Sequence, residues 1–317
     1  MGGQSTTGEL ISIETFGFDN CTIPSLPEPR YGLGSFLTPT MTPQLAVCGG
    51  WWLGKPHSTD CLTLNIASGQ WERGKIENLL GDDVRGVISI EGDGVFIVHR
   101  IGISILTKGS KSWVAGPVFP TPAECGCNVS RTSFVTIHMS DTQNVREYIV
   151  TDGEALAAEG TWPSLRTKRQ GPGCGATSFH LVVAGGVSGF DEVLTSVEVF
   201  HVATKAIRAG GNLQHARAFF QIIPIGSTHL QLLAVGGQSS SSPRKTSEVW
   251  QEDDDSWEEG PELATGRSSF GAIMVRPHLV CLESNPPVHS CPAAGNTNQT
   301  CKFPIPHPGD TVFCPCR

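Results

Sequence analysis

The stretch LVVAGGVSGFDEVLTSVEVF, residues 181–200, decides the fold of this chain. It consists of an apolar run that ends in two glycines, a polar loop, and a run rich in β-branched residues. The same order recurs in LAVCGG followed by TDCLTLNI (45–66) and in LLAVGG followed by TSEVWQE (232–252). A fourth glycine pair, Gly2 and Gly3, is followed by GELISIET (8–15). Apolar, β-branched runs bounded by glycine predict strands, and their recurrence predicts a repeat protein.

A second periodic mark is a leucine four residues before an arginine. It occurs at Leu26/Arg30, Leu165/Arg169, Leu213/Arg217 and Leu263/Arg267, with Leu80/Arg85 one residue looser. One copy is missing between Trp113 and Arg131, where PVFPTPAECGC (117–127) stands in its place. From Arg30 to Arg267 is 237 residues, and five intervals give about 47 residues per unit. Six such units fill the chain up to about Cys281.

Strand signals in every unit, at a period near 50, favour four-stranded blades of a propeller. We therefore predict an all-β, six-bladed propeller; the alternative is a β-sandwich with fortuitous glycines. In each unit, an inner strand follows the arginine, the second strand ends in Gly-Gly, the third is the β-branched run, and the fourth lies near a tryptophan. The glycines suit a tight strand exit, where a Cβ would obstruct the backbone.

This pattern resembles the kelch repeat over nearly the whole chain to about residue 283. The match is good around Gly50, Gly186 and Gly237, and degenerate in the two units between, where IVHRIG (97–102) and IVTDG (149–153) replace the glycine pair. The placement of Cys48 and Cys61 is similar to that in extracellular kelch-like propellers of invertebrates. The resemblance implies a binding or adhesion module, or alternatively an intracellular adaptor that binds actin or presents substrates to a ubiquitin ligase.

The two ends of the chain are expected to share one blade. The repeats finish with SSFGAIMV (268–275) and HLVCLE (278–283), which we expect to pair with GELISIET (8–15) and CTIPSL (21–26) near the start. Such closure removes exposed sheet edges. The propeller is therefore predicted to span residues 1–283. Residues 284–317, rich in proline and cysteine, form an irregular or disordered tail, because they lack the aliphatic residues to build a core.

The chain has 11 cysteines. Cys48 and Cys61 fall on neighbouring strands, so we expect a disulfide between them; two buried free thiols are the alternative. A second bridge is expected among the cysteines at the starts of inner strands, between Cys127 and Cys174. Zinc is disfavoured, because the Cys-x-Cys spacings are too short for a zinc knuckle and no histidine stands beside them. No metal or cofactor is predicted.

Three sequons mark candidate glycosylation sites at Asn20, Asn128 and Asn298. Together with the cysteines they favour an extracellular, secreted protein; the alternative is a cytoplasmic one. The first residues lack the basic and apolar regions of a signal peptide, which counts against secretion. Because the chain starts within a blade, at a glycine pair, we expect the N-terminus to be incomplete, which would explain the missing signal.

Composition narrows the partners and argues against an enzyme. A net charge of −8 is unsuited to nucleic acid, and no apolar run is long enough for a membrane span. The nucleophile-elbow, zinc-protease and phosphate-loop motifs are missing from the sequence. Copper–radical oxidases on related folds need two tyrosines beside paired histidines. Tyr31 and Tyr148 have no such histidines nearby. We therefore expect a non-catalytic module.

The most suggestive binding residues are Trp51 and Trp52, which follow the first strong glycine pair. With His57 they are expected to form a rim that binds a protein or glycan on the loop face; packing against a neighbouring blade is the alternative. Arg30 is a further candidate, since the periodic arginines could point into a central funnel and bind an anion. Their recurrence instead favours a structural role, in which each bonds to nearby carbonyls.

Overall fold

The structure is a computed structural model. It describes residues 1–283 except 3, 6–7, 10–11, 15–20, 52–57, 66–67, 75–82, 139–142, 160–161, 190, 226–229, 240–241 and 275–281. The chain divides into two compact units, Met1–Leu282 and Glu283–Arg317. The described residues contain no helix, and hence none with the length and apolarity to cross a membrane.

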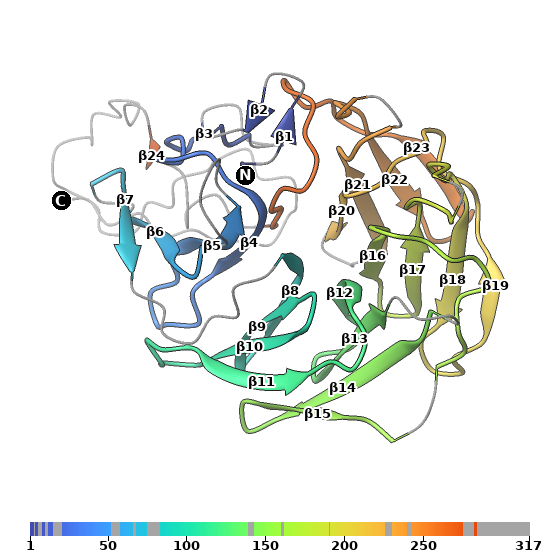
Figure 1. The fold of residues 1–317 in the computed structure, drawn as a ribbon, viewed down its shortest axis with the longest axis horizontal. Helices are drawn as coiled ribbons and strands as arrows, with labels where there is room; N and C mark the ends of the chain where they lie inside the picture. The colour runs from blue at the N-terminus through green and yellow to red at the C-terminus, as the bar shows by residue number, and fades with distance from the viewer. Residues whose placement is uncertain are drawn as a thin grey trace, which may run out of the picture. The chain divides into compact units, whose positions relative to one another are not determined.

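Five four-stranded antiparallel sheets follow one another along the chain and form the blades of a propeller (Figure 1). The first blade consists of β4 (Tyr31–Leu37), β5 (Leu45–Trp51), β6 (Cys61–Asn65) and β7 (Gln70–Gly74). The second blade consists of β8 (Val84–Ile90), β9 (Gly94–His99), β10 (Gly102–Thr107) and β11 (Val114–Val118). The third is β12 (Ala123–Asn128), β13 (Ser133–His138), β14 (Val145–Thr151), β15 (Glu154–Ala157). The fourth blade consists of β16 (Gly173–Ala176), β17 (His180–Ala184), β18 (Val197–His201) and β19 (Ile207–Ala209). The fifth blade consists of β20 (Gln221–Ile225), β21 (Gln231–Val235), β22 (Ser247–Gln251) and β23 (Ser256–Glu259).

The predicted count of six blades is wrong, because the described residues form five. The remaining repeat is divided between the two ends of the chain, and its short strands pair as two separate two-stranded sheets. One joins β1 (Gln4–Ser5) to β2 (Gly8–Glu9), and the other joins β3 (Cys21–Thr22) to β24 (Leu282–Glu283). The N-terminal residues also meet the segment after the fifth blade: the amide of Gln4 donates to Ser268 O (2.9 Å), and that of Ser268 donates to Gln4 O (3.0 Å).

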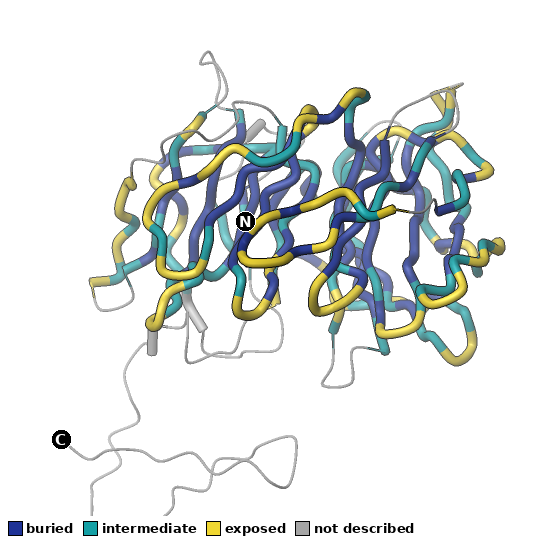
Figure 2. Tube along the Cα trace, turned by 90° about the horizontal axis from the view of Figure 1, so that it is seen from below, coloured by how far each residue is buried: buried dark blue, intermediate teal, exposed yellow. Residues whose placement is uncertain are grey.

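The hydrophobic core lies between adjacent blades. One cluster joins the second and third blades through residues such as Phe96 and Phe134, and the next joins the third and fourth through Trp162 and Phe200. Buried residues accordingly run through the strands, and exposed ones gather on the connecting turns (Figure 2). Blade-to-blade packing of this kind makes each sheet depend on its neighbours.

The spacing between leucine and arginine has a physical reason, which the fifth blade shows. Arg217 is buried and donates to Gly236 O (2.7 Å), to Thr246 O (2.9 Å) and to the Glu248 carboxylate (2.6 Å). That carboxylate also accepts the amides of Gln214 (2.6 Å) and His215 (3.1 Å), which belong to the spacer between Leu213 and Arg217. A spacer of three residues thus places two N–H donors and one guanidinium around the same carboxylate.

The same contacts recur at two other arginines. Arg169 bonds to Gly185 O (2.8 Å), Ser196 O (2.8 Å) and Glu198 (3.1 Å) in the fourth blade. Arg267 receives its three partners from the N-terminal residues: Gly2 O (3.1 Å), Ser12 O (3.0 Å) and the Glu14 carboxylate. The first glycine of each pair therefore presents its carbonyl to the arginine of the same repeat.

Candidate functional site

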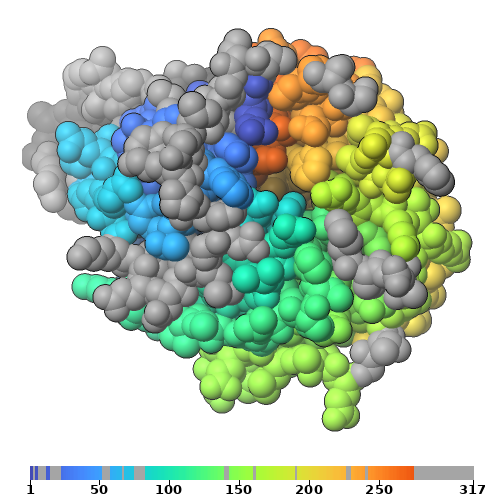
Figure 3. Space-filling view, in the orientation of Figure 1, coloured from blue at the N-terminus to red at the C-terminus, as the bar shows by residue number. Residues whose placement is uncertain are grey.

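The inner strands of the five blades, together with residues 271–274, line a central channel of about 770 Å³. Where the inner strands begin, the channel meets a second cavity of about 300 Å³, here called the channel mouth. Figure 3 shows the ring of blades in the orientation of Figure 1, with a hollow at its centre. The channel mouth is lined by Tyr31, Trp51, Asp83, Arg85, Glu124 and Phe219, among others.

A chain of backbone hydrogen bonds runs around the channel mouth from blade to blade. The amide of Gly32 donates to Ser269 O (2.6 Å), that of Ser269 to Phe219 O (2.9 Å), and that of Phe219 to Gly171 O (2.8 Å). These four residues each stand two positions after a repeat arginine, and all have positive φ, between 50° and 65°. Left-handed backbone at a serine and a phenylalanine is uncommon and marks a position held by its surroundings.

The backbone chain ends at a side chain. The amide of Gly171 donates to the Glu124 carboxylate (2.8 Å) in the third blade, in place of a backbone carbonyl. Glu124 lies where the register between β12 and β13 shifts, and Arg85 lies at the matching shift between β8 and β9. A β-bulge re-aims the side chain of its extra residue. The second and third blades thus place a cation and an acid at the channel mouth.

Arg85 is anchored at the channel mouth by an acidic neighbour. Its guanidinium forms an ion pair with Asp83 (3.2 Å), whose carboxylate also accepts a hydrogen bond from the indole N–H of Trp51. The Nε of Arg85 is buried without a hydrogen-bond partner. Trp51 stacks on Tyr31, its cross-strand neighbour in the first blade, with ring centroids 6.4 Å apart. The channel mouth therefore combines an aromatic wall with an arginine–aspartate ion pair.

Burial raises the pKa of the Glu124 carboxyl above its usual range. The Gly171 amide and the nearby Arg85 and Arg100 favour the ionised form, but they do not fully offset the loss of water. Perturbed acids beside an arginine in a cavity are typical of binding and catalytic sites.

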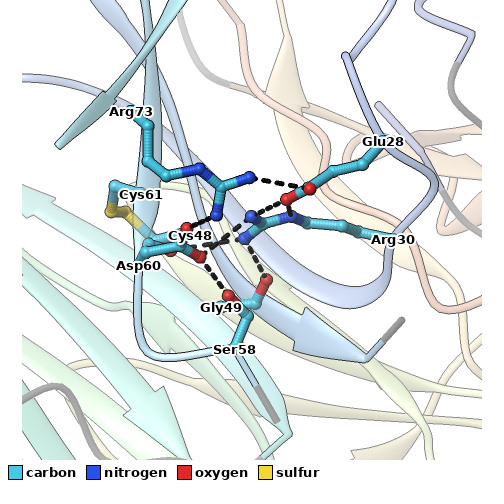
Figure 4. Close-up of polar contacts among 8 residues, drawn as sticks. All are labelled: Glu28, Arg30, Cys48, Gly49, Ser58, Asp60, Cys61 and Arg73. Atoms are coloured by element: carbon cyan, nitrogen blue, oxygen red, sulfur yellow. Dashed lines mark hydrogen bonds and ion pairs between the residues drawn. A yellow bond between two sulfur atoms is a disulfide. The ribbon is translucent and has the colours of Figure 1, made fainter. Parts of the chain in front are cut away.

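Of the binding residues predicted from the sequence, the structure describes Trp51 and Arg30. Trp51 is half-buried at the channel mouth, whereas Trp52 and His57 lie outside the described residues. Arg30 is only 1% exposed and faces away from solvent into an ion cluster of the first blade (Figure 4). It donates to Gly49 O (3.1 Å) and pairs with Glu28 and with Asp60 (2.8 Å). Its surroundings match the structural alternative, in which the arginine bonds to nearby carbonyls.

The cluster around Arg30 is a variant of the regular network. Leu62 stands where the fourth and fifth blades carry Glu198 and Glu248, and Pro27 in the spacer has no N–H to offer a carboxylate. Glu28, from the spacer itself, supplies the acid instead and also binds Arg73 (2.7 Å). Burial opposes ionisation of Glu28, but the two arginines prevail and lower the pKa of its carboxyl.

The predicted Cys48–Cys61 disulfide is present and joins directly paired residues of β5 and β6, with Cα atoms 4.1 Å apart. The predicted Cys127–Cys174 bridge is not formed: both residues are free and buried, as is Cys125. Among the described residues, no three histidine, cysteine or acidic side chains are placed to hold a metal ion.

Of the three predicted glycosylation sites, the structure describes Asn128. Asn20 and Asn298 lie outside the described residues. Asn128 ends β12, and its Nδ2, the atom that a glycan would occupy, donates to Ser89 O (3.0 Å). Glycosylation at Asn128 therefore stays a prediction, and it would require this contact to break.

Sequence reasoning missed Arg85 and Glu124 as site residues. The signal was present, because Arg85 breaks the Leu-x-x-x-Arg spacing and Glu124 lies in the segment where that motif is absent. In the sequence, both irregularities were interpreted as degenerate copies of the repeat and not as signs of a site. In the structure they coincide with the two register shifts that direct these side chains to the channel mouth.

Comparison with known proteins gives two informative matches. Over 104 residues the chain is 29% identical to "Kelch repeat-containing protein kel-10" of Caenorhabditis elegans, which covers 32% of this chain and 18% of that protein. The solved structure titled "Structure of YjhT" matches with a TM-score of 0.62 at 13% identity, over 75% of this chain and 86% of that one. No family model matches the chain. The two matches confirm the resemblance to kelch-repeat propellers, and the second speaks to the fold alone.

Proposed function

We propose that this kelch-repeat propeller is a non-catalytic binding module that holds a segment of a partner protein at the channel mouth. The observation that carries the proposal is the gathering of Arg85, Asp83 and Glu124 beside the stacked rings of Tyr31 and Trp51. In the fourth and fifth blades, the corresponding arginines and glutamates are buried in internal contacts. Arg85 and Glu124 have internal partners as well, but they also line a cavity.

The chemistry favours a partner segment with a carboxylate next to an apolar side chain. The guanidinium of Arg85, which lines the channel mouth, is a charged group suited to a carboxylate. The rings of Tyr31 and Trp51 offer an apolar wall beside it. A cavity of about 300 Å³ accommodates one or two side chains, so the rest of the partner would contact the surrounding loops.

Adhesion or recognition outside the cell is supported by the Cys48–Cys61 disulfide, since such bonds persist in oxidising compartments. The alternative is an intracellular adaptor, which the three free thiols of Cys125, Cys127 and Cys174 favour. Intact-mass analysis of protein from its native source, with and without thiol alkylation, separates them. Alkylation of every cysteine without prior reduction would contradict the extracellular role.

The binding proposal is tested with a displayed library of random peptides and a glycan array, both screened against the full chain. We expect peptides containing Asp or Glu next to an apolar residue to be enriched. The affinity for an enriched peptide, measured by calorimetry, should fall at least tenfold in Arg85→Gln and in Trp51→Ala. The matched control is Arg208→Gln, an exposed arginine that pairs with Asp255 away from the channel mouth.

Two results would overturn the proposal. One is peptide binding that is the same in Arg85→Gln, Arg208→Gln and the unmodified chain, provided that circular dichroism shows all three folded. The other is enrichment of glycans alone, with no peptide bound, which would assign the channel mouth to a carbohydrate.

A further inference from the structure

Three cysteines from two neighbouring blades form a thiol cluster beneath the channel mouth. Cys125 and Cys127 belong to β12, the inner strand of the third blade, and Cys174 belongs to β16, the inner strand of the fourth. All three are free and buried, and they belong to one hydrophobic cluster between these blades. The binding role proposed above uses none of them.

Strand alternation directs the three thiols toward one another. A Cβ on Gly126 would meet Val98 of the second blade at 2.9 Å, so Cys125 and Cys127, on either side of it, face the opposite way, toward the fourth blade. A Cβ on Gly175 would meet Ile222 of the fifth blade at 2.5 Å, so Cys174 faces the third blade. The thiol of Cys174 accordingly interacts with those of both Cys125 and Cys127.

We infer that Cys174 is the common partner of a reversible disulfide that joins the third and fourth blades through either Cys125 or Cys127. A peroxide is the class of oxidant that the step requires. One thiol is oxidised by hydrogen peroxide to a sulfenic acid with release of one water, and the second thiol displaces a second water as the S–S bond forms. Two thiol hydrogens leave in these waters, and the peroxide is reduced.

The channel gives a small oxidant access to the cluster, whereas burial raises the pKa of the Cys125 and Cys174 thiols and so slows their oxidation. All three cysteines line the central channel, whose volume of about 770 Å³ admits a molecule as small as peroxide. After one bridge forms, the remaining thiol of the Cys125 and Cys127 pair lies beside it and can attack the same Cys174 sulfur. Such exchange keeps the bridge mobile and open to reduction by a small thiol.

The bridge would also restrain residues at the channel mouth. Glu124 is the residue before Cys125, and Gly171, whose amide it accepts, lies three residues before Cys174. A covalent link between β12 and β16 therefore fixes the two strands whose starts carry this hydrogen bond. Among the described residues, the two blades are joined by packing, hydrogen bonds and the Lys205–Glu147 ion pair (2.9 Å), with no covalent cross-link between their strands.

The test is disulfide mapping on the full chain. The folded protein is treated with hydrogen peroxide, denatured, alkylated, digested without reduction and analysed by mass spectrometry. We expect a cross-linked peptide that contains Cys174 and either Cys125 or Cys127, with a mass two hydrogens lower than the sum of the reduced peptides, which disappears after reduction. Cys174→Ser should abolish it, whereas Cys125→Ser and Cys127→Ser should each retain it.

The double variant Cys125→Ser/Cys127→Ser is a second control, because it removes the partners and leaves Cys174 in place. Three outcomes would overturn the inference: complete alkylation of Cys174 in the peroxide-treated folded protein, a bridge between Cys125 and Cys127 that omits Cys174, or a bridge from Cys174 to another cysteine. Circular dichroism before and after treatment establishes that the protein remains folded.

Discussion

The fifth blade and the second and third blades use their charged residues in opposite ways. In the fifth blade, Arg217 and Glu248 are both fully buried, and the two terminal nitrogens of the guanidinium bond to Gly236 O, Thr246 O and the Glu248 carboxylate. In the second and third blades, Arg85 and Glu124 lie at register shifts and line the channel mouth. Regular repeats thus bury their charges in internal contacts, whereas irregular repeats place theirs in the wall of a cavity.

The largest effect is expected where the regular network is broken. Arg217→Ala leaves the Glu248 carboxylate buried without its cation, which should lower the free energy of unfolding by about 3–5 kcal/mol. Urea denaturation measures the change. Arg208→Ala, at an exposed pair with Asp255, should cost less than about 1 kcal/mol. If both variants lose the same free energy of unfolding, burial does not explain the contribution of the regular network to stability.

The next effect concerns the first blade, where Leu62 replaces the glutamate and a disulfide is added. The double variant Cys48→Ala/Cys61→Ala should lower the free energy of unfolding by about 3 kcal/mol, because the unfolded chain regains the freedom of a short loop. The measurement is urea denaturation without reductant. If the double variant is as stable as the unmodified chain, the ion cluster around Arg30 alone secures this blade.

A smaller effect is expected at the glycine pairs of the regular blades. Gly185 has φ of +60°, and a Cβ there would lie 2.3 Å from Arg217 O. Gly185→Ala should therefore cost about 2 kcal/mol or more in thermal or urea denaturation. Gly189→Ala is the matched control, since a Cβ at Gly189 meets no atom within 4 Å. A neutral Gly185→Ala would mean that the strand exit relaxes without cost.

The smallest effect on stability is expected at Glu124, and it should depend on pH. Because burial raises the folded-state pKa of Glu124, the folded chain holds this proton more tightly than the unfolded chain. Stability is therefore lost as pH rises from the unfolded value through the folded one. Glu124→Gln, which can still accept the Gly171 amide, should match the unmodified chain at pH 4 and be more stable at pH 8.

Urea denaturation of both proteins at pH 4 and pH 8 checks this sign. A variant that is less stable than the unmodified chain at pH 8 would show that the ionised carboxylate is favoured in the fold. Glu124 would then stabilise the channel mouth as the buried glutamates of the regular blades stabilise theirs.

The sequence alone determined the repeat, the all-β class, the strand positions in the regular blades and the Cys48–Cys61 pairing. These follow from local order, since paired glycines, β-branched runs and the Leu-x-x-x-Arg spacing each act within one sheet. Only the tertiary structure decided the number of complete blades, the burial of Arg30 and the placing of Arg85 and Glu124 at the channel mouth. Those features depend on contacts between blades and on register shifts, which a single repeat read by itself does not contain.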